Sequence, residues 1–233
     1  MMKRARGWNA VTTRKRANIG SEPDPLALLS ALAGGGRNNE GPSLGRGLGE
    51  DPDTKLYVEG RHIYFQDDIN FDTASALVKT INELATELEF MSKQYDLEPI
   101  PIALHITSPG GIVFAAYSIV DAMDKCAVPV DTVVDGYAAS CGTIISIHGR
   151  HRTIGKNAVM LCHQVSSQMW GSYNEEEQVD HHVNLKQMSE NIRRMYAEKT
   201  NMTKTMLKEL LKHDMDWNAD QCLKYGLVDE IIY

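Results

Sequence analysis

A serine in the middle of the chain has the surroundings of a nucleophile. Ser140 follows a segment of small residues, 135–139, and precedes an apolar stretch, 142–147, that predicts a helix. At the start of a helix, free amides and the helix dipole favour negative charge on a neighbouring oxygen. A nucleophilic Ser140 with the Cys141 amide beside it would therefore have half of an oxyanion hole.

Two further features would complete such a site. Gly110 and Gly111 end the SPGG segment 108–111, where glycine lets the backbone approach a substrate closely. The Gly111 amide would supply the second half of the oxyanion hole. His163 directly follows the apolar run 158–162. Taken alone, each feature has a simpler interpretation: a glycine turn, a helix-capping serine and a structural histidine.

The elements around these residues explain why they would meet. Apolar runs predict strands over 61–65, 100–106, 130–134, 158–162 and 228–232, and 135–140 is predicted to be a turn. Helices are predicted over 113–125, 142–147, 175–199 and 203–212. Two more helices are expected, one capped by Asp72 and one ending at Gly226.

The alternation of strands and helices predicts an α/β fold with a largely parallel sheet. In such sheets ligands bind at the carboxyl ends of the strands. Gly111, Ser140 and His163 are all expected at that edge, and this shared position favours a functional interpretation over three separate structural ones.

Composition excludes several classes of function. The hydrophobic content of 42% fits a soluble globular protein. No apolar run reaches the roughly eighteen residues of a transmembrane helix, so no membrane partner is expected. The formal net charge of −7 argues against general nucleic-acid binding.

The cysteine and histidine patterns indicate no metal site. Adjacent His181 and His182 would diverge by about 100° on a helix, and no HExxH spacing occurs. The cysteines have no CxxC pairing and lie in apolar runs, so buried free thiols in a reducing compartment are expected. They are Cys126, Cys141, Cys162 and Cys222.

The first 54 residues differ from the rest of the chain. Residues 1–20 carry six Lys or Arg and no acid, which fits a transit peptide, a disordered basic arm or a removable pro-segment. Residues 21–54 are rich in Gly, Pro, Asn and Asp and are typical of a linker. We expect a disordered or processed arm over 1–54 and one folded domain over 55–233.

From Leu56 to Ile232 the chain resembles the proteolytic subunit of the Clp protease family, the caseinolytic ATP-dependent serine peptidases. Four motifs in order carry the resemblance: SPGG at 108–111, GYAASCG at 136–142, MLCHQ at 160–164 and LKYGLVD at 223–229. They are spread over about three quarters of the chain.

The resemblance implies a crotonase-like α/β fold with a protruding handle helix, here 175–199, and a Ser-His-Asp triad. Ser140 matches the nucleophile and His163 the base, while Gly111 and Cys141 match the two oxyanion amides. Asp214 matches the third triad member, because it lies five residues before Ala219, as the family's triad aspartate lies before its equivalent alanine. Asp216 is the alternative.

The resemblance also implies an assembly. Family subunits form two stacked heptameric rings around a chamber, and a hexameric AAA+ unfoldase feeds it with protein or peptide substrates. The handle helix joins the rings, and an apolar stripe fits that use: Val179, Val183, Leu185, Met188, Ile192 and Met195. No cofactor is implied. The implied location is the cytoplasm, or an organelle matrix if the arm is a transit peptide.

Some positions depart from the family pattern. Val165 stands where proline is common, and Gly171 is the one glycine in 168–173, a segment expected to be a glycine-rich strand. Lys212 and His213 replace an acidic-Arg pair that commonly links neighbouring subunits.

Three other classes fit parts of the pattern. A crotonase-type acyl-CoA hydratase or isomerase shares the fold but typically uses carboxylates in place of Ser and His. An inactive ring subunit keeps the fold, although such subunits usually lose a triad residue. A viral head-maturation protease of the same fold needs no ATPase, and the long N-terminal arm leaves that alternative open.

Overall fold

One mixed, mostly parallel sheet organises the chain. The computed structural model describes residues 55–166, 172 and 174–232, so the expected arm over 1–54 and most of 168–173 lie outside the described residues. The main strand order is β1-β2-β3-β4-β5-β8, and β6 and β7 extend the sheet from β4. The strands are β1 Leu56–Glu59, β2 His62–Phe65, β3 Ile102–Ser108, β4 Val130–Ala139, β5 Arg152–Gly155, β6 Val159–Cys162, β7 Met215–Asn218 and β8 Glu230–Ile232.

Most strand pairs follow the parallel pattern expected from the sequence. β2, β3, β4, β5 and β8 run parallel to one another, and β6 runs parallel to β4. β1 pairs antiparallel with β2, and β7 pairs antiparallel with β6. The α/β class and the mostly parallel sheet are confirmed and agree with a crotonase-like fold.

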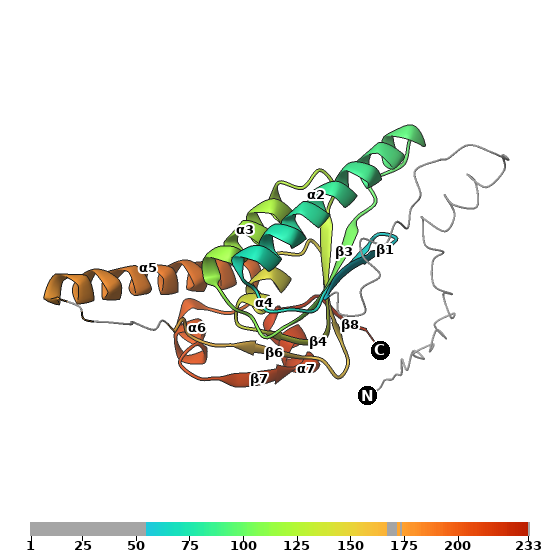
Figure 1. Ribbon diagram of the computed structural model, residues 1–233. Helices are drawn as coiled ribbons and strands as arrows, with labels where there is room; N and C mark the ends of the chain where they lie inside the picture. The colour runs from blue at the N-terminus through green and yellow to red at the C-terminus, as the bar shows by residue number, and fades with distance from the viewer. Residues whose placement is uncertain (1–54, 167–171, 173, 233) are drawn as a thin grey trace, which may run out of the picture. The chain divides into compact units, whose positions relative to one another are not determined.

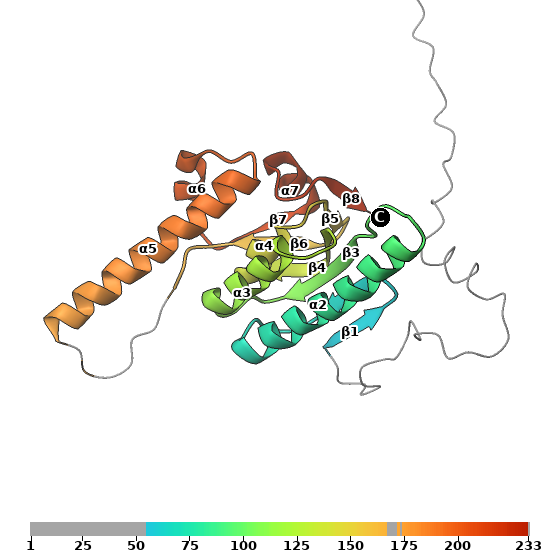
Figure 2. The same cartoon turned by 90° about the horizontal axis from the view of Figure 1, so that it is seen from above.

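Helices cover the sheet and extend beyond it. α2 and α3 lie side by side along one face of the sheet (Figures 1 and 2). The buried positions Leu77, Ile81, Leu84 and Leu88 give α2 an apolar stripe toward the core. The helices are α2 Phe71–Gln94, α3 Val113–Asp124, α4 Cys141–Ser146, α5 Glu175–Lys199, α6 Lys204–Leu210 and α7 Ala219–Tyr225.

Three local expectations have clear outcomes. The cap of α2 is Asn70, because its side chain accepts from the amides of Asp72 and Thr73; the prediction of Asp72 as the cap is wrong. The predicted range of α5 is confirmed, and Asn174 caps it. Gly226 ends α7 in the left-handed conformation with φ 74°, as predicted.

The turn predicted over 135–140 is wrong, because β4 continues as a strand to Ala139. Its first half pairs with β5, and its second half pairs with β6 through Tyr137, Ala138 and Ala139. Ala138 and Ala139 are buried within the sheet instead of forming a turn. Ser140 alone makes the change of direction into α4.

α5 projects away from the sheet at its N-terminal end (Figures 1 and 2). Val179 and Val183 of the apolar stripe are 56% and 44% exposed, and within α5 the buried residues are Ile192 and Tyr196. Among the residues that the structure describes, only the C-terminal part of α5 therefore packs against the rest of the chain.

Candidate active site

The carboxyl ends of three strands meet at one edge of the sheet. β3 ends at Ser108 opposite Ala138 of β4, and Ala139 at the end of β4 lies opposite Leu161 of β6. The segments that follow these strands carry the glycine pair, the serine and the histidine. The shared edge expected for Gly111, Ser140 and His163 is thus present.

Ser140 has a strained backbone at the strand-to-helix turn. Its φ is 53° and its ψ −118°, and its N–H donates to the carbonyl of Leu161 at 2.8 Å. Residues other than glycine rarely adopt such values, and strain of this kind concentrates at functional sites. Its side chain makes no capping hydrogen bond to α4. The simple interpretation of Ser140 as a helix cap therefore fails.

The glycine pair lies directly against this turn. Gly110 has φ 92°, and a Cβ placed on it would lie 2.6 Å from the Cβ of Ser140. Gly111 has φ 150°, and its added Cβ would lie 2.1 Å from the Ile69 carbonyl. Both positions need glycine, for conformation and for space.

The two expected oxyanion donors lie on these abutting segments. The Ile69 N–H donates to the Gly110 carbonyl, and the Ile69 carbonyl accepts from the Ile112 N–H. The Gly111 N–H takes no part in these two hydrogen bonds. Cys141 is the first residue of α4, where a helix provides no acceptor for the amide. The Cys141 thiol donates to the Gly111 carbonyl at 3.1 Å, so it links the two donor residues.

His163 leaves the end of β6 and contacts one aspartate. Its Nδ1 lies 3.5 Å from Oδ1 of Asp214, slightly beyond ordinary hydrogen-bond length. Catalytic contacts are often this long without substrate. The antiparallel register pairs Cys162 with Met215, and one step further along it His163 lies opposite Asp214.

Asp216 occupies a different position. It pairs with Leu161 on β6, and its charge, after burial, raises the pKa of Tyr137 on β4. The structure therefore brings Asp214, and not Asp216, to His163.

A small cavity of about 60 Å³ joins the serine and the histidine. Val113, Ile144, Ile192 and Tyr196 contribute apolar side-chain surface to it beside Ser140, Cys141 and His163. The sequence interpretation missed Tyr196. The available signal was its spacing of four residues from Ile192, which places both side chains on one face of α5.

The buried thiols near the cavity are poor nucleophiles. Burial raises the pKa of the Cys141 thiol, and burial raises that of Cys162 to about 11. Both remain protonated at neutral pH, and a thiol reacts as its thiolate. The hydroxyl of Ser140 is therefore the better candidate. All four cysteines are free, three of them buried as expected, whereas Cys126 is half-buried.

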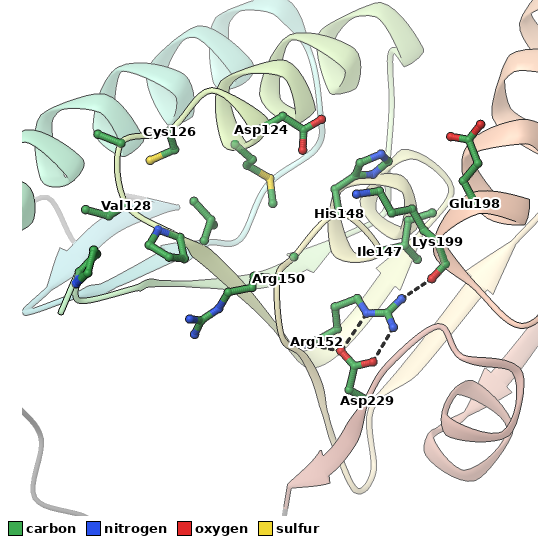
Figure 3. A pocket seen from close by; sticks show the side chains of 16 residues that line it. Asp124, Cys126, Val128, Ile147, His148, Arg150, Arg152, Glu198, Lys199 and Asp229 are labelled. Atoms are coloured by element: carbon green, nitrogen blue, oxygen red, sulfur yellow. Dashed lines mark hydrogen bonds and ion pairs between the residues drawn. The ribbon is translucent and has the colours of Figure 1, made fainter.

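A larger cavity lies at the opposite edge of the sheet, near the amino ends of β4 and β5 (Figure 3). Its volume is about 690 Å³, but its two arginines already have partners. Arg150 pairs with Asp131, and Arg152 pairs with Asp229. None of the residues singled out above for chemistry lines this cavity, so we place the candidate site at the smaller one.

Among the described residues, no three His, Cys, Asp or Glu side chains are grouped to hold a metal ion. Within the same part of the chain, no helix is both long and apolar enough to span a membrane.

Comparisons with known proteins agree with this geometry. The family model described as Clp protease matches residues 51–233. The ATP-dependent Clp protease proteolytic subunit of Leuconostoc citreum is 33% identical over 136 residues, which cover 56% of this chain and 66% of that protein, just under two thirds. The subunit of the same name from Streptococcus mutans is 31% identical over 153 residues, 65% of this chain and 77% of that protein.

Subunit 1 of the ATP-dependent Clp protease of Chlamydia pneumoniae is 28% identical over 185 residues, which cover 77% of this chain and 90% of that protein. The family model covers most of the chain, including every strand and helix around Ser140 and His163. The chain belongs to the Clp protease family.

Proposed function

We propose that this chain is a serine endopeptidase subunit that cleaves unfolded polypeptides. Ser140 is the nucleophile, His163 the general base and Asp214 the residue that orients the imidazole. The amides of Gly111 and Cys141 stabilise the oxyanion. The observation that carries the proposal is the strained Ser140 at a strand-to-helix turn, sharing a cavity with a histidine that contacts a carboxylate.

The proposed reaction follows acyl-transfer chemistry. The Ser140 oxygen attacks the peptide carbonyl while His163 accepts the serine proton, and the carbonyl oxygen becomes an anion. Collapse of this intermediate breaks the C–N bond, and His163 gives its proton to the leaving amine. Water then attacks the acyl-enzyme with His163 again as base, which releases the acid and restores Ser140.

The proposed assembly is a pair of stacked heptameric rings enclosing a chamber, fed by an ATP-dependent unfoldase. Two findings support it: the names of the relatives, which describe proteolytic subunits of ATP-dependent proteases, and the shape of α5. The N-terminal part of α5 exposes Val179 and Val183, which suits a helix that packs against another subunit.

Labelling by a fluorophosphonate probe tests the proposed nucleophile. Wild-type protein is expected to react covalently at Ser140, and Ser140→Ala should lose labelling and peptide cleavage by more than about a thousandfold. Ser146→Ala is the matched control, because it removes a buried hydroxyl without a partner from α4, the helix that follows Ser140. Absence of labelling in the folded wild type would contradict the proposal.

A further inference from the structure

A buried chain of hydrogen bonds joins α5 to the peptide group of Ser140. Tyr196 on α5 is only 2% exposed, and its hydroxyl is hydrogen-bonded to Oγ1 of Thr143 on α4. Thr143 Oγ1 in turn donates to the carbonyl of Ser140 at 2.6 Å. A carbonyl can only accept, so that bond uses the single hydroxyl proton of Thr143, and Tyr196 is the donor in the other.

The same two hydroxyls also reach the strand that carries the histidine. Cys162 is the last residue of β6 and directly precedes His163. Its thiol is buried, and Tyr196 and Thr143 are near enough to lower its pKa against the larger effect of burial. The hydroxyl pair therefore lies between the two segments that present the serine and the histidine.

Tyr196 keeps its proton in this position. Burial raises the pKa of its hydroxyl well above the ordinary value, since a phenolate would be desolvated there. The donor to Thr143 is therefore present throughout the neutral range. Hydrogen bonds in such a chain polarise and strengthen each other in a buried setting.

The strained backbone of Ser140 requires support of this kind. A residue held outside the ordinary φ/ψ regions persists only when its surroundings fix it. The Ser140 N–H is held by the Leu161 carbonyl, and its C=O accepts from both the amide and the hydroxyl of Thr143, at 3.1 and 2.6 Å. Through Thr143, Tyr196 extends this support beyond β4, β6 and α4 to α5.

We propose that Thr143 and Tyr196 are positioning residues. They hold the Ser140 peptide in its reactive conformation and connect it to the C-terminal part of α5. The inference rests on the proposed role of Ser140 as nucleophile. It gives a structural reason for the conformation of Ser140: Tyr196, in the buried part of α5, holds the serine peptide through Thr143.

Three variants test the inference. Thr143→Val removes the donor to Ser140 at nearly constant volume, Tyr196→Phe removes only the outer hydroxyl, and Thr143→Ser keeps the hydroxyl. We expect Thr143→Val to lower kcat for a short peptide, and the fluorophosphonate labelling rate, about tenfold, with KM little changed. Tyr196→Phe should cause a smaller loss of the same kind, and Thr143→Ser should stay close to wild type.

The matched control is Thr80→Val. Thr80 is buried on α2 and donates to the Ala76 carbonyl at 2.9 Å, so the substitution removes a similar bond far from the site. It should lower the thermal midpoint as Thr143→Val does but leave kcat unchanged. A kcat loss in Thr80→Val equal to that in Thr143→Val would assign the effect to stability and overturn the inference.

The outcomes separate the two proposals. If the wild type is labelled and active, and kcat is unchanged in both Thr143→Val and Tyr196→Phe, the positioning role alone is overturned. Failure of Thr143→Ser to keep the wild-type rate also overturns it, because a hydroxyl at that position would then not be the cause. Unlabelled wild type overturns the nucleophile and the positioning role together.

Discussion

Ser140 depends on two residues that are far from it in the sequence. Gly110 leaves room for the Cβ of Ser140, and any larger side chain there would also meet the Ala139 carbonyl at 2.6 Å. Thr143 and, behind it, Tyr196 hold the carbonyl of Ser140 from the other side. At the scale of residues, the site consists of the strained Ser140, whose backbone is held on both sides, and of His163, which follows the neighbouring strand β6.

The two aspartates near His163 should differ in their effect on catalysis. Asp214→Asn replaces the carboxylate 3.5 Å from His163 Nδ1 by an amide, which no longer stabilises the imidazolium or selects the tautomer. We expect kcat for peptide cleavage to fall by more than about a hundredfold. Asp216→Asn should change it little, because Asp216 pairs with Leu161 in the sheet and its charge, after burial, raises the pKa of Tyr137.

Asp216→Asn is thus the matched control, two residues away on the same segment and with the same change of charge. Steady-state kinetics at one pH, with circular dichroism to verify folding, would measure both. Equal losses, or a larger loss in Asp216→Asn, would show that Asp214 is not the third member of the triad.

Among the elements, β7 and the end of α6 determine where Asp214 lies. β7 pairs antiparallel with β6, and this register sets Asp214 opposite His163. In the preceding turn, the Lys212 amide donates to the Glu209 carbonyl, and its ammonium pairs with both carboxylate oxygens of Glu209 at 2.8 and 3.0 Å. Lys212, which departs from the family pattern, thus has a partner within its own segment.

Another connection joins elements at the opposite edge of the sheet. Arg152 on β5 donates to the carboxylate of Asp229 and to the carbonyl of Lys199 at the end of α5 (Figure 3). It also donates to the carbonyl of Gly226 at the end of α7. Its side chain is 13% exposed. The hydrogen bond from Arg152 is the main reason that the pKa of Asp229 is lower than its ordinary value.

This ion pair should make stability depend on pH in a defined direction. The pKa of Asp229 is lower in the folded chain than in the unfolded one, so the ionised form favours folding. That contribution is present above the unfolded pKa of about 3.9 and is lost as pH falls through the folded value. Asp229→Asn should lower the urea midpoint at pH 7, and the difference from wild type should shrink below about pH 4.

Urea titrations at fixed protein concentration would measure the effect, with Glu87→Gln, an exposed carboxylate on α2, as the control. The control should leave the midpoint at pH 7 nearly unchanged. A difference between wild type and Asp229→Asn that stays constant down to pH 3 would show that packing, and not charge, is responsible.

On the described helices of the molecule, several large apolar side chains are exposed. Phe71 and Phe90 on α2 are each 62% exposed, Phe114 on α3 is 60% exposed, and Val179 on the projecting part of α5 is 56% exposed. Contiguous exposed apolar patches mark surfaces that bind other proteins, and these side chains offer apolar surface for such contacts. They support the proposed ring assembly, in which neighbouring copies would cover them.

The native mass tests this assembly. Light scattering is expected to give about fourteen times the 26.0 kDa of one chain, as two stacked heptameric rings require. Val179→Glu should place charges between the rings and reduce the mass to about half, whereas Glu176→Gln on the same part of α5 should not. A monomeric wild type would contradict the chambered assembly while leaving the test of Ser140 unaffected.

Local patterns predicted much of this molecule. The range of α5 and the cap at Gly226 follow from helical spacing and from glycine at a helix end, both of which act within a few residues. Strands β3 and β6 were predicted within two residues of their bounds because they are buried apolar runs. β1, β5 and β7 were not predicted, since each is only four residues long and β1 and β7 have few buried positions.

The sequence by itself determined which residues are candidates for chemistry, because Ser140, His163 and the glycine pair lie in motifs whose spacing along the chain is visible. The tertiary structure alone decided that β4 runs up to Ser140, that β7 sets Asp214 beside His163, and that Tyr196 reaches the serine through Thr143. Each of these depends on pairing or packing between segments distant in the chain, and local periodicity does not specify which segments meet.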